Sequence, residues 1–201
     1  DRITTAVRTQ VLRQLVRLTG LSAEYLELSD LRIDIWKFCK ELRRADGVVV
    51  GRLDSRIMGQ EGRGTADGPE NDPSMSAIRP PYTAAFNRYC REVLGFQTDR
   101  SYQILGGAYA KWDWGKGNQY TDTSVHLRQA MCRNPHMQVF VASGYYDLAT
   151  PHFAAEYTFS HMGLPEALRD QIAISYYPSG HMMYIESGCL EQLTVDVAAW
   201  A

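Results

Sequence analysis

Two residues in the C-terminal third of the chain are of types that cooperate in proton transfer. Asp147 closes the segment G-Y-Y-D, and His181 closes the segment P-S-G-H. An imidazole has a pKa near neutrality, so it can take the proton of a weak nucleophile such as a serine hydroxyl. A buried carboxylate can hold that imidazole in one tautomer and stabilise the imidazolium that forms. The two residues are therefore candidates for the acid and the base of a Ser-His-Asp triad.

The elements around these two residues predict that both lie at one edge of a sheet. Residues 137–143 and 172–177 are apolar runs rich in β-branched or aromatic residues, which is typical of buried strands. In parallel sheets, function collects at the carboxyl ends of the strands, and Asp147 and His181 follow those ends. Helices are predicted before, between and after the strands, which indicates a parallel sheet covered on both faces. The predicted helices are residues 121–133, 151–162 and 189–200.

Longer stretches around the same residues resemble bacterial members of the serine carboxypeptidase family. Residues 142–151 (A-S-G-Y-Y-D-L-A-T-P) and 180–184 (G-H-M-M-Y) carry the resemblance most specifically. Weaker likeness extends it over nearly the whole chain. The segments concerned are residues 50–56 (V-G-R-L-D-S-R), 72–74 (D-P-S), 81–83 (P-Y-T) and 112–114 (W-D-W).

The resemblance implies roles for three residues. Family members place the triad Asp three residues after a glycine at this strand end and the triad His in a Gly-His-Met segment, which matches Asp147 and His181. The residue after that His lines the pocket for the leaving C-terminal residue, which implies the same role for Met182. The activity implied is hydrolysis of C-terminal residues from peptide substrates through an acyl-enzyme, in an extracytoplasmic compartment (periplasmic or secreted).

The nucleophile of the family has no counterpart in this chain. It lies in Gly-x-Ser-x-Gly on a sharp strand-to-helix turn, and no serine here has glycine at the second position on both sides. We therefore expect an α/β chain that is the C-terminal portion of an α/β-hydrolase parallel sheet, preceded by a mainly helical cap region. The serine would lie in an N-terminal half of the same protein, which would be the partner of this chain. Without that half, the apolar strands would keep an open edge and make the chain prone to aggregate.

Residues 1–118 are expected to form the cap region, and residues 119–201 the last strands and helices of the hydrolase core. The helix predicted at residues 30–44 would have Ser29 or Asp30 as its N-cap residue. Residues 101–120, which are aromatic and glycine-rich, have no assigned element. The elements predicted in the cap are helices at residues 2–19, 30–44 and 82–94, a short helical stretch between the first two, a β-hairpin near 48–56 and an irregular loop at 59–81.

Charge and composition argue against several kinds of partner. With 21 basic and 23 acidic residues, the formal net charge is −2, which gives no reason to expect nucleic acid as a partner. No apolar run is long enough for a membrane span. The four cysteines include no C-x-x-C pair, so zinc is not expected. No cofactor is predicted, because the remaining histidines also lack ligand spacing: His126, His136, His152 and His161.

Three functions stay open at this point. The complete protein could be a carboxypeptidase, or it could use the same triad as an acyltransferase or esterase. A panel of peptides with free or amidated C-termini and of simple esters would separate these two. The chain could also be a non-catalytic fragment that acts only as a binding or assembly piece, and the missing serine favours this for the chain by itself.

Overall fold

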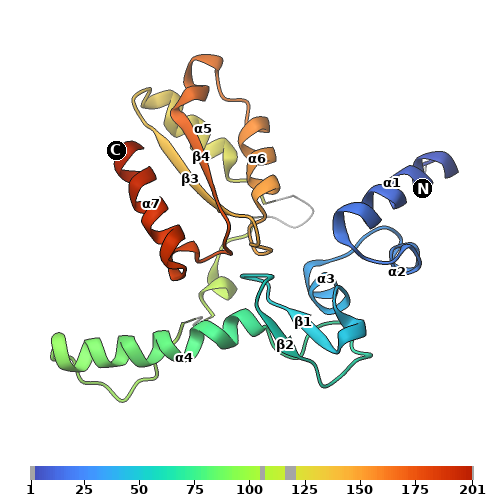
Figure 1. The fold of residues 1–201 in the computed structure, drawn as a ribbon. Coiled ribbons are helices and arrows are strands. Elements are labelled where there is room, and N and C mark those ends of the chain that lie inside the picture. The colour runs from blue at the N-terminus through green and yellow to red at the C-terminus, as the bar shows by residue number, and fades with distance from the viewer. Residues whose placement is uncertain (1–2, 105–106, 116–120, 201) are drawn as a thin grey trace. The chain divides into compact units, whose positions relative to one another are not determined.

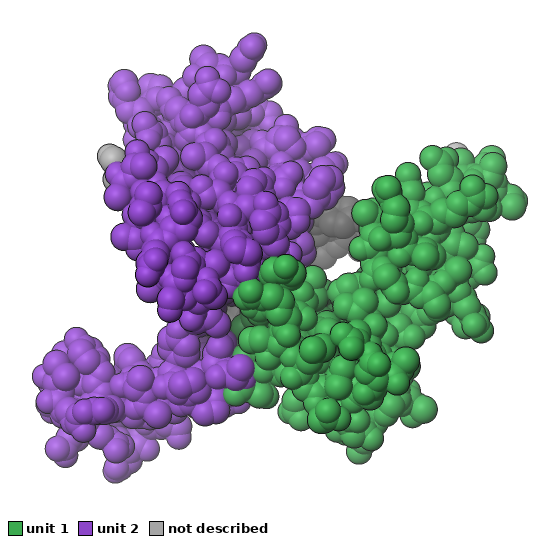
Figure 2. All heavy atoms as spheres, viewed as in Figure 1, with its two compact units in different colours: residues 1–76, 146–149 green, residues 77–145, 150–201 purple. Residues whose placement is uncertain are grey.

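The chain divides into two compact units, which Figure 2 shows in different colours. The structure is a computed structural model of the 201-residue chain, and it describes residues 3–104, 107–115 and 121–200 (Figure 1). The first unit comprises residues 1–76 and 146–149, and the second residues 77–145 and 150–201. The sequence predicts a cap at residues 1–118 and a core at residues 119–201. This division refers to a complete hydrolase fold, so it stays a prediction.

Three helices open the first unit, and each begins next to a side chain that caps it. They are α1 (Thr5–Thr19), α2 (Ala23–Leu28) and α3 (Ile35–Glu41). Their N-cap side chains accept backbone N–H groups of the first turn, which satisfies donors that have no partner inside a helix. The capping residues are Thr4, Ser22 and Asp34.

The start of α3 corrects the prediction of a helix over residues 30–44. Asp30 and Leu31 have positive φ values of 50° and 60°, and a right-handed helix excludes that conformation. The expected cap Asp30 instead forms an ion pair with Arg8 at 2.8 Å. A helix can therefore begin only after these two residues, where Asp34 caps it.

A buried ion pair holds the segment that follows the hairpin of the first unit. The hairpin consists of β1 (Val48–Val50) and β2 (Met58–Gln60), which pair antiparallel. Lys40 Nζ on α3 lies 2.7 Å from Glu61 Oε2, and the two side chains are only 1% and 5% exposed. Hydrogen bonds from Lys40 and from the backbone N–H of Arg63 lower the pKa of Glu61, so its carboxylate stays charged. Part of the predicted loop at 59–81 is thus a strand and an anchored turn.

The helix predicted at 82–94 begins earlier, within the same predicted loop. α4 runs from Pro73 to Arg88 and continues into a π-helical turn over Tyr89–Val93. Asp72 stabilises the early start because its Oδ1 accepts the N–H of Ser74 at 3.0 Å. Pro80 and Pro81 lie inside α4, where prolines normally break a helix, and this is why sequence patterns missed its first turns. The unassigned stretch contains a short 3-10 helix, η3 (Ala108–Lys111); residues 105–106 and 116–120 lie outside the described residues.

The second unit is built around a parallel pair of strands. β3 (Val139–Gly144) and β4 (Ile172–Tyr177) pair from Val139 opposite Ile172 to Gly144 opposite Tyr177. The two predicted strands and the three predicted helices around them are confirmed, with ends that differ by a few residues. The remaining elements are α5 (Ser124–Arg133), α6 (His152–His161), η4 (Glu166–Gln171), η5 (Met183–Ile185) and α7 (Ser187–Trp200).

Helices cover both faces of this pair (Figure 1). Side chains alternate along a strand, so Val139 and Ile172 face one side, and Ala142 and Tyr177 face the other. The first side packs in a cluster with α5 and the end of α6, and the second packs against α7 and η5. The described chain is therefore mixed helix and sheet, with a parallel two-stranded sheet between helical layers and a separate antiparallel hairpin.

We expect Lys40→Ala to destabilise the first unit by about 3 kcal/mol or more, because it leaves the Glu61 carboxylate buried without its cation. Chemical denaturation followed by circular dichroism measures the loss. The matched control is Arg8→Ala, which removes a solvent-exposed ion pair and should cost less than about 1 kcal/mol. Equal losses in the two variants would contradict the assigned role of the Lys40–Glu61 pair.

Candidate functional site

The two strands of the second unit end together, so the segments after them start at one edge of the sheet. Gly144 at the end of β3 is paired with Tyr177 at the end of β4. The pairing continues one step further, because the N–H of Tyr145 donates to the carbonyl of Tyr177 at 3.0 Å. The loops that carry the predicted acid and base therefore begin side by side, as expected for a parallel sheet.

Gly144 lets the loop after β4 pass very close to the end of β3. A Cβ at this position would lie 2.2 Å from the carbonyl oxygen of Gly180 and 2.6 Å from that of Ser179. No real Cβ tolerates such contacts, so the approach requires glycine here. This contact fixes the backbone directly before His181.

His181 is exposed and reaches the loop between β3 and α6. Its Nδ1 lies 3.2 Å from Thr150 Oγ1, a hydrogen-bonding distance. Thr150 follows Asp147 by three positions along that loop. Sequence reasoning did not single out Thr150, because a lone threonine before a proline carries no signal of its own.

Asp147 is a buried carboxyl group, with 5% of the residue exposed. Its Oδ1 accepts the N–H of Ala149 at 2.7 Å, which forms a local turn around the carboxylate. Asp147 belongs to the first compact unit and His181 to the second. The pairing of the carboxylate with the imidazole stays a prediction.

Main-chain hydrogen bonds fix the backbone on both sides of Asp147. The N–H of Ser55 donates to the carbonyl of Tyr146 at 3.0 Å, and the N–H of Leu148 donates to the carbonyl of Arg52 at 3.0 Å. Arg56 adds a cation–π contact, with its guanidinium carbon 4.9 Å from the centre of the Tyr146 ring. Residues 52–56, which lie nearly a hundred positions upstream in the sequence, therefore position the predicted acid.

A buried polar network fixes that upstream segment. Ser74 Oγ donates to Asp72 Oδ1 at 2.5 Å and accepts the N–H of Leu53 at 3.0 Å. Gly51 allows the close packing, since a Cβ there would lie 2.6 Å from the Cβ of Ser74. Two of the stretches that resemble the carboxypeptidase family thus meet in space, and their contacts are those of a structural support.

The two methionines after His181 have different surroundings. Met183 is buried in the cluster that contains Tyr177 and Cys189. Met182 is partly buried and precedes the η5 turn, where its carbonyl accepts the N–H of Ile185 at 3.1 Å. Its predicted role in a pocket for the leaving residue stays a prediction.

The nearby serines do not have the exposure of a nucleophile. Ser143 in β3 and Ser179 in the loop before His181 are 6% and 0% exposed.

In the described part of the chain, no group of His, Cys, Asp or Glu side chains could hold a metal ion. All four cysteines are free thiols. None of the described helices combines the length and apolar character needed to cross a membrane.

No protein-family model, curated protein or solved structure matches this chain. The functional assignment therefore depends on the residues and their geometry.

We expect Gly144→Ala to displace the loop at 178–181 and to destabilise the second unit by about 1–3 kcal/mol, because the added Cβ overlaps the backbone of Gly180. Denaturant unfolding gives the loss, and amide chemical shifts of the loop report the displacement. Gly64→Ala is the matched control, since nothing lies within 4 Å of a Cβ there. It should stay within about 0.5 kcal/mol of the unsubstituted chain. Unchanged shifts at 178–181 in Gly144→Ala would contradict the close approach.

Proposed function

We propose that this chain is part of a serine-type carboxypeptidase of the α/β-hydrolase kind, in which Asp147 is the acid and His181 the base of the triad. One observation carries the proposal: the backbones that lead to these residues leave adjacent parallel strands at one edge, where Gly144 packs against Gly180. The contact of His181 Nδ1 with Thr150 brings the ring to the loop after β3, and the bond from Nδ1–H to the Asp147 carboxylate that a triad needs is part of the proposal. The nucleophilic serine would come from an N-terminal half of the same protein.

In the proposed reaction, His181 Nε2 takes the proton of the serine hydroxyl while the serine oxygen attacks the carbonyl carbon of the last peptide bond. The imidazolium then protonates the nitrogen of the leaving C-terminal residue, the C–N bond breaks, and an acyl-enzyme remains. Water, deprotonated by His181, then attacks the ester carbonyl carbon. The ester C–O bond breaks and the imidazolium returns its proton to the serine oxygen, which frees the shortened peptide and the serine. Asp147 would hold the tautomer, Met182 would line the pocket for the leaving residue, and no cofactor takes part.

We expect His181→Ala to lower hydrolysis of a blocked dipeptide by the complete protein by at least about 10³-fold, because the serine loses its base. Asp147→Asn should also lower the rate strongly, through the wrong imidazole tautomer. The control is His136→Ala, which changes an exposed histidine in the turn before β3 and should leave the rate unchanged. Activity of His181→Ala within about tenfold of the unsubstituted enzyme would defeat the assignment.

An acyltransferase or esterase would keep the same triad and differ only in its substrate. Peptides with a free C-terminal carboxylate, the same peptides amidated, and simple esters separate the possibilities. A carboxypeptidase should cleave the free peptides fastest. The family resemblance further supports an extracytoplasmic place of action, either periplasmic or secreted.

The open edge of β3 favours a second candidate, a non-catalytic role in assembly. Among the described residues, β3 has β4 as its sole neighbour in the sheet, although residues 139–142 read V-F-V-A. A continuous apolar run of this kind is typical of strands inside a parallel sheet. The unpaired N–H and C=O groups of such an edge can accept a further strand, which the N-terminal half would supply.

We expect the isolated chain to self-associate through this edge in sedimentation velocity, and to stay unlabelled by a serine-directed fluorophosphonate probe. The first outcome follows from the unpaired strand, and the second from the lack of a serine in a Gly-x-Ser-x-Gly segment. A monodisperse monomer that unfolds cooperatively would contradict the need for a partner strand. Labelling of the chain alone would oppose the purely non-catalytic role.

A further inference from the structure

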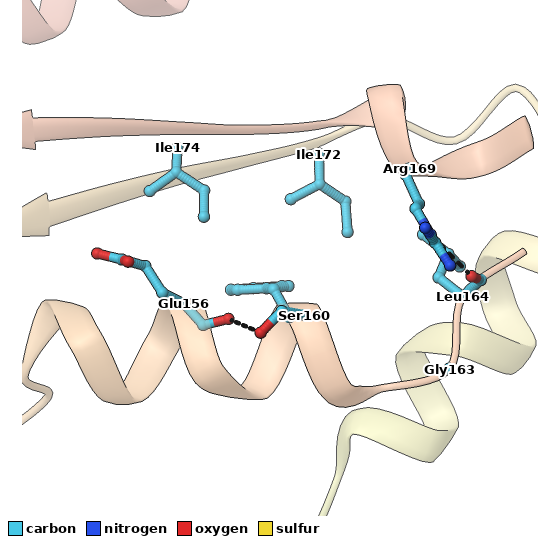
Figure 3. Close-up of a pocket in the computed structure, with 8 residues that line it drawn as sticks. Glu156, Ser160, Gly163, Leu164, Arg169, Ile172 and Ile174 are labelled. Atoms are coloured by element: carbon cyan, nitrogen blue, oxygen red, sulfur yellow. Dashed lines mark hydrogen bonds between the residues drawn. The ribbon is translucent and has the colours of Figure 1, made fainter. Parts of the chain in front are cut away.

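A groove of about 360 Å³ lies between α6 and β4 in the second unit, and neither Asp147 nor His181 lines it (Figure 3). This volume is at the lower end of the range for small-molecule sites, which is roughly 300–1,000 Å³. The groove lies at β4, so it does not use the open edge of β3. Its lining combines an apolar floor with one acidic and one basic side chain.

The floor of the groove is a continuous apolar surface. Ile172 and Ile174 point from the same side of β4 toward α6, as Figure 3 shows. Phe159 and Leu164 also line it, and both belong to the hydrophobic cluster on that side of the sheet. This floor can accommodate an aliphatic side chain.

One end of the groove carries a fixed negative charge. Glu156 Oε1 lies 3.1 Å from His152 Nδ1. Hydrogen bonds from His152 and from the Tyr176 hydroxyl lower the pKa of Glu156, so the carboxylate is charged at neutral pH. A carboxylate has about four acceptor positions, so these two donors leave room for an ammonium group.

The other end carries positive charge. Arg169 comes from η4, and its Nε donates to the carbonyl of Leu164 at 3.4 Å. Within the described residues, no ion pair with a carboxylate engages Arg169. A second guanidinium is close by, because Arg128 Nη1 would lie 3.1 Å from a Cβ at Gly163, which lines the groove.

We propose that this groove binds a short peptide of two or three residues with free termini and a central or terminal aliphatic side chain. Its ammonium group would meet Glu156, its carboxylate would meet Arg169, and its side chain would cover Ile172 and Ile174. The spacing fits, because the rise along α6 from Glu156 to its last residue, His161, is about 7.5 Å at roughly 1.5 Å per residue, and Arg169 contacts the chain beyond that end. An extended tripeptide covers a similar length at about 3.3 Å per residue. Neither Asp147 nor His181 lines the groove, so this site would be regulatory or, on the proposed function, would retain product.

The test uses the 201-residue chain and the tripeptide Ala-Leu-Ala in three forms: free, N-acetylated and C-amidated. In calorimetric or NMR titrations, we expect each blocked form to bind at least about tenfold more weakly than the free peptide, because each loses one charge pair. Glu156→Gln keeps the side-chain shape and should abolish the difference between free and acetylated peptide. Arg169→Gln should abolish the difference between free and amidated peptide.

The matched controls are Glu166→Gln and Arg133→Gln, which neutralise exposed charges that do not line the groove. Both should keep the full discrimination. Equal affinity for the three peptides, no binding at millimolar peptide, or loss of discrimination in the controls would each overturn the proposal. The readout is binding, so it is independent of whether His181 proves to be a catalytic base.

Discussion

The closeness of two strand-end loops is the constraint on which the candidate site depends. β3 and β4 run parallel and end opposite one another, and the next backbone N–H, that of Tyr145, continues the pairing. The loop after β4 can then cross the end of β3 only because Gly144 has no Cβ to meet the carbonyl of Gly180. A side chain there would force the loop away and move His181 with it. The missing Cβ of Gly144 thus permits the course of the backbone before His181, and Thr150 contacts the imidazole itself.

Buried polar contacts hold the segments of the first unit from which Asp147 is positioned. Lys40 and Glu61 are both buried and satisfy one another, and Ser74 links Asp72 to the backbone of Leu53. Such networks are costly when a partner is removed, because the remaining group stays desolvated without compensation. Their geometry is correspondingly strict. A network of fixed geometry can hold the backbone on either side of Asp147 in one place. The carboxyl group needs one fixed orientation if it acts in a triad.

The two strands of the second unit offer surfaces of different chemical character. The open edge of β3 presents main-chain donors and acceptors, which select for another strand and are largely indifferent to its sequence. The groove beside β4 presents an acid, a base and an aliphatic floor, which select for charge and size. The first surface therefore suits assembly with the remainder of a sheet, and the second suits recognition of a small zwitterion.

Local patterns in the sequence were sufficient to predict β3, β4 and the helices around them, because apolar periodicity and capping residues act over a few positions. They also placed Asp147 and His181 directly after the strand ends. Tertiary contacts decided the rest. Asp72, which starts α4 upstream of two prolines, also accepts the N–H of Arg52, and Asp30, whose positive φ delays α3, pairs with Arg8. The Lys40–Glu61 pair, the contact of Thr150 with His181 and the main-chain anchors around Asp147 join residues far apart in the chain. No short-range pattern encodes such contacts, because packing of the whole unit decides which distant groups meet.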